Sequence, residues 1–261
     1  MTTAAAPPAP YLDLPQVTLC AASSVNVAAT IKALERCMDK ARFGAALLFT
    51  DDCTAALPPT VRRVEIAPLH SSAQYSRFML GELAPWITTS HCLVVQWDGF
   101  IVNPHLWDTR FLDYDYIGAS WPQFADGHDV GNGGFSLRSR RLLDACLAQG
   151  FRYDGEAEDL AICRTNRKML EIDHAIRFAD RETADSFSAE RRGAVSCAFG
   201  FHGAFNLIEA VGVSAFQETY RKLDHRATLR IDLWPIFLKL LKRGAIASAL
   251  RFASSIKRSH C

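Results

Sequence analysis

Neither a membrane-spanning segment nor a disulfide framework is evident in this chain of 261 residues. No run reaches the roughly 18 to 20 apolar residues that a bilayer-spanning helix requires. The eight cysteines are spread along the chain without a Cys-x-x-Cys pair, and the Ala- and Pro-rich start lacks the cationic and apolar regions of a signal peptide. We therefore expect reduced thiols and a cytoplasmic protein, either soluble or peripheral at the inner face of a membrane.

An excess of charge of one sign is found only near the C-terminus. Residues 221–261 hold ten Lys and Arg against two acidic residues, a net charge of +8, which leaves a net charge of −7 on the remainder. A protein that binds nucleic acid needs a basic face. Because the body of the chain is mildly acidic, nucleic acid is excluded as an expected partner.

The basic tail also contains regularly spaced apolar residues. Residues 231–241, and then Ile246, Leu250, Phe252 and Ile256, predict one or two short amphipathic helices. Helices of this composition suit an anionic membrane surface, which would make the tail a peripheral anchor. The alternative, that the tail packs on the domain and exposes its cations, stays open.

The main part of the chain alternates between short apolar runs and helical apolar stripes. Predicted strands lie at residues 17–20, 45–50, 61–66, 92–95, 114–118 and 134–137, with helical spacing between several of them. Such alternation predicts an α/β fold with a mostly parallel central sheet flanked by helices. We expect a disordered lead-in at residues 1–15, a single domain at 16–222 and the helical tail at 223–261.

Four short segments place chemically useful residues at the ends of these elements. Asp98 follows the apolar run 92–95, and ligands of parallel sheets bind outside the carboxyl ends of the strands. Residues 131–134 (Gly-Asn-Gly-Gly) expose backbone amides, Glu158-Asp159 opens a predicted helix, and residues 199–203 place an imidazole beside a glycine. Each segment also has a purely structural interpretation, as a turn, a tight connection, a first helical turn or a core histidine.

Taken together, the four segments indicate a sugar-nucleotide site. Transfer of a glycosyl group from a nucleoside diphosphate requires neutralisation of the departing diphosphate and removal of a proton from the acceptor hydroxyl. Asp98 and His202 offer oxygen and nitrogen ligands for Mn²⁺ or Mg²⁺. Gly203, at a helix start, would add amides and a positive dipole end near phosphate. Asp159 is a candidate general base.

The order of these segments resembles the GT-A superfamily of nucleotide-sugar glycosyltransferases, and within it the fringe-like enzymes. Residues 96–100, 131–139 and 199–203 are more similar still to an uncharacterised glycosyltransferase-like domain family, over about residues 16–220. The resemblance implies a GT-A-like, Rossmann-like fold and an inverting transfer, in the synthesis of a surface glycan or glycolipid, to a glycan or lipid-linked hydroxyl acceptor.

The resemblance also implies roles for individual residues. It makes Asp98 and His202 the metal ligands and Asp159 the base in the Glu-Asp pair of the catalytic site, with Glu158 as the structural or hydrogen-bonding partner of that base. The residues expected to bind the nucleotide-sugar donor are Asn26, Asp51, Gln96, Trp97, Asp98, Gly133, Gly134 and Gly203. Trp121, in a Ser-Trp-Pro loop, is expected to stack on the acceptor sugar.

One position departs from the pattern of that superfamily. Gln96 stands where the metal-binding motif has its first Asp, although a Gln side chain can still hydrogen-bond a ribose. This substitution motivates the alternative of a non-catalytic domain that binds a glycan or nucleotide. A nucleotidyltransferase ranks last, because residues 20–26 have neither the glycine nor the cation of its phosphate loop. Arg138 and Arg140 could meet phosphate, but we expect them to be solvated.

Overall fold

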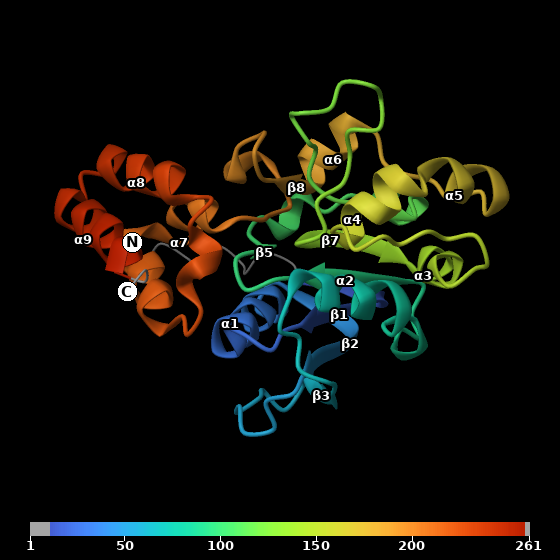
Figure 1. Ribbon diagram of the computed structural model, residues 1–261, viewed down its shortest axis with the longest axis horizontal. Helices are drawn as coiled ribbons and strands as arrows, with labels where there is room; N and C mark the ends of the chain where they lie inside the picture. The colour runs from blue at the N-terminus through green and yellow to red at the C-terminus, as the bar shows by residue number, and fades with distance from the viewer. Residues whose placement is uncertain (1–10, 259–261) are drawn as a thin grey trace, which may run out of the picture.

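A computed structural model describes residues 11–258 of the chain and contains a six-stranded sheet flanked by helices (Figure 1). Its strands are β1 (Leu12–Ala22), β2 (Ala41–Thr50), β3 (Arg62–Glu65), β4 (His91–Val95), β6 (Tyr116–Ile117) and β7 (Phe135–Ser139). They lie in the order β3-β2-β1-β4-β7-β6, and β7 is antiparallel to both of its neighbours. The other pairings are parallel. The predicted α/β fold with a mostly parallel central sheet is confirmed.

The first strand begins earlier than predicted. Residues 12–15, assigned to the disordered lead-in, pair with β2 from Leu12 onward, so the boundary at residue 16 is wrong. A register shift between Leu14 and Thr18 accommodates Pro15, which cannot donate to the ladder. Gly44 of β2 packs closely against the backbone of Pro15, since a Cβ at Gly44 would be 2.1 Å from the Pro15 carbonyl oxygen. Residues 1–10 of the predicted lead-in lie outside the described residues.

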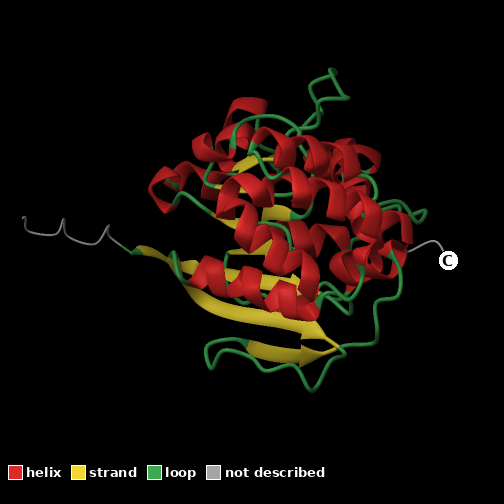
Figure 2. Ribbon diagram, turned by 90° about the vertical axis from the view of Figure 1, so that its left-hand side faces the viewer, coloured by secondary structure: helices red, strands yellow, loops and turns green. Residues whose placement is uncertain are grey.

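Both faces of the sheet are buried, as the apolar strands require. Leu19 and Leu93 face one side and pack with α1 (Val27–Met38), whose apolar stripe includes the fully buried Leu34. The next residues along, Cys20 and Val94, face the other side. That side is covered by α2 (Ser72–Gly81), the 3₁₀ turn η1 (Ala84–Trp86) and α3 (Arg140–Cys146). Figure 2 shows helices lying in front of the strands.

A second, smaller sheet joins distant parts of the chain. Its strands are β5 (Phe100–Ile101), β9 (Gly200–Phe201) and β8 (Ser188–Ala189), in the order β5-β9-β8. Phe100 pairs with Phe201, so the segment after Asp98 lies beside the one that leads to His202. Strands of two residues have no detectable period in the sequence, and this sheet was not predicted.

The C-terminal tail forms helices that pack on the preceding one. The 19-residue helix α7 (Ala204–Lys222) has a kink at Gly212, where φ is 79°. The turn η6 (Arg226–Leu229) and the helices α8 (Leu233–Lys242) and α9 (Ile246–Arg258) follow it. Ile236 and Leu240 of α8 are buried in the core that includes α7. Among residues 11–258, no helix is long and apolar enough to cross a bilayer.

Shorter elements complete the chain. They are the 3₁₀ turns η2 (Pro104–Leu106), η3 (Thr109–Asp113) and η5 (Val195–Cys197), the π-helical turn η4 (Ala161–Thr165), and the helices α4 (Glu158–Leu160), α5 (Arg167–Asp173) and α6 (Arg181–Phe187). The seven cysteines within the described part of the chain are all free, five of them buried.

Substitution of Gly200 tests the packing that positions the second sheet. A Cβ at Gly200 would be 2.2 Å from the ring of Phe135, which is fully buried and cannot move away easily. We expect Gly200→Ala to lower the free energy of unfolding by ~1–3 kcal/mol, as overpacking does, measured by urea denaturation. Adding Phe135→Leu should recover part of the loss. The matched control is Gly81→Ala, where a Cβ meets nothing within 4 Å; an equal loss in this variant would contradict the packing argument.

Candidate functional site

A cavity opens where β1 and β4 end side by side. After β1 the chain continues to β2 and β3 on one side of this pair, whereas β6 and β7, which follow β4, lie on the other side. Such a reversal of the strand order is the switch point where ligands bind in open α/β sheets. The cavity has a volume of about 440 Å³, within the usual range for small-molecule sites. Its lining comes from the turn after β1, from α2 and the loop before it, from the segment after β4 and from the tail: residues 22–26, 69–72, Tyr75, Gln96, Trp97, His225 and Thr228.

Asp98 lies beside His202 at the same edge of the sheet. The Asp98 side chain is largely buried, and its Oδ1 is 3.4 Å from His202 Nε2. His202 Nε2 is also 3.2 Å from Gln96 Oε1, and its Nδ1 is 3.2 Å from Glu190 Oε1. The imidazole rests on the glycine loop, since a Cβ at Gly134 would be 2.1 Å from His202 Nε2. The structure therefore brings three of the four predicted segments together.

The charge state of His202 follows from these neighbours. Burial alone would lower its pKa, but the carboxylates of Asp98 and Glu190 outweigh burial and raise the pKa well above the usual value. His202 is therefore an imidazolium at neutral pH. Its interactions stabilise the fold at low pH, and this contribution is lost as the pH rises through the raised pKa.

Glu190 is a site residue that the sequence analysis missed. It follows β8 and accepts hydrogen bonds from the side chains of Asn132 and His202. It thus connects the glycine loop to the imidazole. Nothing around Glu190 in the sequence forms a recognisable pattern, because its position depends on the unpredicted second sheet.

Asp98 and His202 are side chains that could hold a divalent metal between them. Asp98 Oδ1 is buried and has no hydrogen bond among the described residues beyond its 3.4 Å contact with His202 Nε2, so it has room to accept a cation or a donor group. No cluster of three or more His, Cys, Asp or Glu side chains that could hold a metal occurs within residues 11–258. Further ligands would have to come from a bound phosphate or water, and His202 would have to release a proton.

Asp159 lies under the glycine loop at the start of α4. Its Oδ2 accepts a hydrogen bond of 3.0 Å from the Gly133 amide, and its Oδ1 accepts one of 2.8 Å from Leu160. Burial and the neighbouring charge of Glu158 raise the pKa of Asp159 to about 6, because they outweigh these hydrogen bonds. A carboxylate with a pKa near 6 is well suited to accept a proton at neutral pH.

Glu158 points into the interior and pairs with Arg138. Arg138 of β7 is fully buried, and its Nη2 is 2.8 Å from Glu158 Oε1. The guanidinium also donates from Nε to Ser136 Oγ at 3.0 Å. A Cβ at Gly133 would be 2.2 Å from Glu158 Oε1, so only glycine fits above the pair. Glu158 is therefore held in a buried structural ion pair.

The expectation of a solvated side chain is wrong for Arg138 but not for Arg140, whose side chain is 38% exposed. Arg138 is neither solvated nor free to meet phosphate, because its buried guanidinium pairs with the Glu158 carboxylate in the core. Arg140 donates to Asp144 and to the carbonyl of Ile87. Neither guanidinium faces the cavity.

The other residues predicted to bind the nucleotide-sugar donor fall into two groups. Gln96 and Trp97 line the cavity, and Gly203, with φ at 98°, precedes the N-terminus of α7 next to His202. Asn26 also borders the cavity, but its amide side chain donates to the His225 carbonyl at 3.0 Å and accepts from the His225 amide at 2.9 Å. The Asn26 side chain thus holds the tail, and contact of Asn26 with a nucleotide-sugar donor stays a prediction. Asp51 is half-buried and does not line this cavity.

Trp121 is part of the core and not an exposed platform. Only 6% of it is exposed, and its ring packs against Gly131 and, edge on, against Phe124 at 5.5 Å between centroids. The prediction that it stacks on an acceptor sugar is wrong, because the loop folds the indole inward over the glycine segment.

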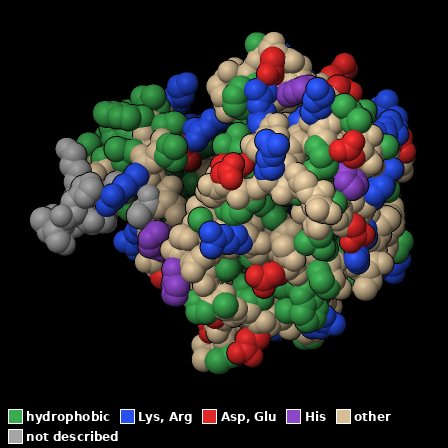
Figure 3. All heavy atoms as spheres, turned by 45° about the vertical axis from the view of Figure 1, so that its right-hand side comes forward, with side chains coloured by type: hydrophobic (Ala, Val, Ile, Leu, Met, Phe, Trp, Pro, Cys, Tyr) green, Lys and Arg blue, Asp and Glu red, His purple; other side chains and the backbone are tan. Residues whose placement is uncertain are grey.

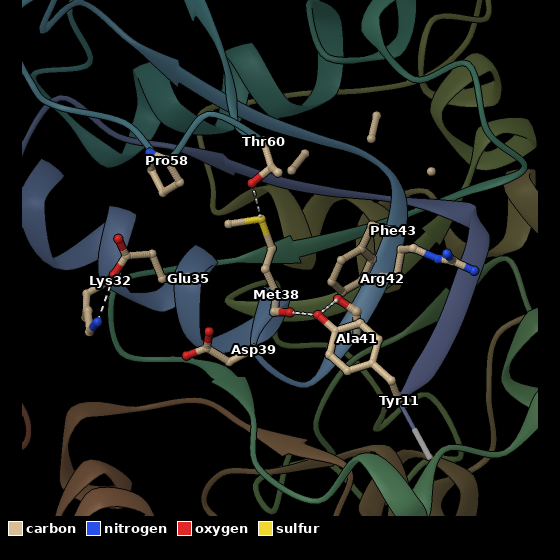
Figure 4. Close-up of a pocket in the computed structure, with 13 residues that line it drawn as sticks. Tyr11, Lys32, Glu35, Met38, Asp39, Ala41, Arg42, Phe43, Pro58 and Thr60 are labelled. Atoms are coloured by element: carbon tan, nitrogen blue, oxygen red, sulfur yellow. Dashed lines mark hydrogen bonds and ion pairs between the residues drawn. The ribbon is translucent and has the colours of Figure 1, made fainter. Parts of the chain in front are cut away.

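A larger cavity lies at the opposite edge of the sheet. Its volume is about 670 Å³, and Figure 4 shows its lining at the start of β2, where the Tyr11 hydroxyl donates to the carbonyl of Met38. Two of its charged side chains, Lys32 and Glu35, pair with one another, and Arg42 pairs with Asp13 of β1. No group of the chemistry predicted above lies here, so the cavity beside Asp98 is the candidate site.

One family model matches more than half of the chain. A family model described as "Protein of unknown function (DUF5672)" matches residues 59–202, which include Asp98, the glycine loop, Asp159 and His202. No curated protein matches the chain.

Two solved structures resemble the fold at low sequence identity. The chain is similar to a glycosyltransferase involved in the glycosylation of the major capsid of PBCV-1, with 11% identity and a TM-score of 0.44, over 79% of this chain and 98% of that one. It is also similar to the protein A197 from STIV, with 12% identity and a TM-score of 0.36, over 63% and 82% of the two chains. Both TM-scores are below 0.5, so neither likeness bears on the chemistry of the site.

The buried ion pair under the glycine loop yields a stability prediction. We expect Arg138→Met to lower the free energy of unfolding by ~3–5 kcal/mol, since it leaves the Glu158 carboxylate buried without a partner. The double variant Arg138→Met/Glu158→Leu should be much closer to wild type, because both charges are then removed. Equilibrium urea denaturation measures all three proteins. A double variant no more stable than the single one would contradict the pairing.

Proposed function

The chain belongs to the DUF5672 family of proteins of unknown function, and we propose that it transfers a glycosyl group from a nucleotide-sugar donor to a hydroxyl acceptor. One observation carries the proposal. A carboxylate with a pKa of about 6, Asp159, is held by the glycine loop whose other face supports His202 beside Asp98. A candidate base and a candidate diphosphate site thus share one loop, at the edge of the sheet where ligands bind.

The cavity beside Asp98 is suited to the nucleoside part of the donor. It combines apolar surface with a few hydroxyl and amide groups, from Ser23, Ser71 and Gln96 among others. The diphosphate would then lie toward His202 and the N-terminus of α7. The first amides of α7 favour negative charge there, because the dipole of a helix is positive at its N-terminus.

Asp98 and His202 would hold Mn²⁺ or Mg²⁺ in this arrangement. When bound, the metal would supply charge neutralisation for the departing diphosphate. The protein itself contributes a support for the ring, because Glu190 holds His202 from Nδ1 and leaves Nε2 on the side of Asp98.

Asp159 would act on the acceptor. Its carboxylate takes the proton from the acceptor hydroxyl while that oxygen bonds to the anomeric carbon, and the bond from this carbon to the diphosphate oxygen breaks. A direct displacement of this kind inverts the anomeric centre. The acceptor we propose is a glycan or a lipid-linked hydroxyl, in the synthesis of a surface glycan or glycolipid.

A non-catalytic binding domain is the second candidate. It is favoured by Gln96, whose Oε1 lies 3.2 Å from the same His202 nitrogen that a metal would need. A domain of this kind would bind a nucleotide or glycan in the cavity without turnover. The two candidates differ in whether the charge of Asp159 matters.

Asp159→Asn separates the two candidates. We expect its kcat for donor hydrolysis or transfer to fall by roughly 10²–10⁴-fold, the usual contribution of a general base, with donor affinity unchanged. The assay measures hydrolysis and binding of UDP-, GDP- and CMP-sugars with Mn²⁺, Mg²⁺ or EDTA. The matched control is Asp173→Asn, an exposed carboxylate on α5. Full turnover in Asp159→Asn would sink the proposed role, and donor binding without turnover in wild type would favour the binding domain.

The raised pKa of Asp159 predicts the acid limb of the pH profile. Since only the ionised carboxylate accepts a proton, kcat/KM should fall as the pH drops through about 6, by roughly tenfold per unit below it. An unperturbed aspartate would give this limb near pH 4. Initial rates between pH 4.5 and 8 measure the limb, with circular dichroism at each pH to verify folding. A profile that stays flat to about pH 4.5 would contradict the assignment.

A further inference from the structure

Large exposed hydrophobic side chains are concentrated in one part of the described chain. In the body they are scattered singly over distant elements, as Tyr11, Val25, Trp86, Leu147 and Ile172. Single exposed apolar residues are normal on protein surfaces. The others all belong to a segment of 20 residues at the end of the chain: Ile231, Trp234, Leu238, Leu241, Ile246 and Leu250.

Helical spacing puts the exposed residues of α8 on one side. Trp234, Leu238 and Leu241 follow one another at intervals of four and three residues, and Trp234 is 67% exposed. Ile236 and Leu240 point the other way and are fully buried. The helix is therefore apolar on two sides, whereas the core needs only one. Figure 3 shows hydrophobic side chains gathered on the lobe formed by the C-terminal helices.

Positive charge surrounds this apolar side. The sequence has no Asp or Glu after Asp232. Lys242, Arg243 and Arg251 are exposed, and within the described residues none of the three forms an ion pair. Lys239, by contrast, is engaged by Asn206 and Glu209 of α7. The outer side of α8 and α9 thus combines apolar side chains with cations that have no partner in the fold.

We propose that the outer side of α8 and α9 docks on the surface of an anionic lipid bilayer. Exposed Trp and Leu enter the boundary between head groups and acyl chains, and Lys and Arg meet the anionic head groups. The ten-residue helix α8 is too short to span the bilayer, so it lies in the plane of the surface. A second copy of the chain fits this side less well, because a two-fold interface would bring the same cations face to face.

The proposed docking side is connected to the candidate site. Asp232 stands at the N-terminus of α8 and pairs with Arg191 at 2.6 Å, next to Glu190. His225 and Thr228, a few residues earlier, line the cavity beside Asp98. Docking would hold that cavity close to the lipid surface, where a lipid-linked acceptor would be found. This consequence rests on the proposed function, whereas docking itself does not.

Vesicle flotation with the full chain tests the proposal without any measurement of glycosyl transfer. The probes are vesicles of phosphatidylglycerol and phosphatidylcholine in equal parts, and vesicles of phosphatidylcholine alone. We expect wild type to bind the anionic vesicles and to lose affinity as the salt concentration rises. Lys242→Gln/Arg243→Gln should weaken binding roughly thirtyfold, from the loss of two cations near the surface. Trp234→Ser/Leu238→Ser should abolish binding.

The control is Ile172→Ser, which removes an equally exposed hydrophobic residue of the body, 67% exposed like Trp234; its binding should equal that of wild type. Because all these side chains are exposed, the variants should melt like wild type, which circular dichroism verifies. Wild type that binds neither vesicle, or Trp234→Ser/Leu238→Ser that binds as well as wild type, would overturn the proposal. Sedimentation equilibrium adds one more outcome: a dimer that this double variant abolishes, without vesicle binding, would make the same side a self-association surface instead.

Discussion

The candidate site depends on one buried ion pair. The sheet carries the Arg138 guanidinium into the interior, where a lone charge would be strongly destabilising, and Glu158 neutralises it at 2.8 Å. This pairing fixes where α4 begins, since the Glu158 amide also donates to Ser76 of α2. The next residue, Asp159, is thereby held under the glycine loop. The Arg138–Glu158 pair, which has no proposed role in the reaction, thus positions Asp159, the proposed base.

The glycine loop connects the two halves of the site. On one side Gly133 approaches Glu158 so closely that no side chain fits, and its amide binds Asp159. On the other side Gly134 supports the ring of His202, which the small sheet brings from a segment about seventy residues later in the chain. Glycine is needed here for close approach and not for a positive φ, since neither residue adopts one. The two functional halves therefore share a single rigid support.

The sequence was informative where local chemistry and secondary structure coincide. The parallel strands, the placement of Asp98 after β4 and the helix start at Glu158 were predictable, because apolar runs, strand ends and acidic first turns have local signatures. Arg138, Glu190 and Trp121 were missed or misread for one common reason. Their surroundings are made by residues distant in the sequence, and neither a buried ion pair nor a two-residue strand leaves a periodic signal.

The tie between Asn26 and His225 has a consequence for how the protein is made. Asn26 lies in the turn between β1 and α1, yet the backbone that its side chain binds lies 199 residues later. The sheet around β1, β2 and β4 can assemble while the ribosome is still translating the second half of the chain. The wall of the cavity cannot close until residues 225–228 have emerged. A nascent chain can therefore be folded in its core well before it is able to hold a ligand.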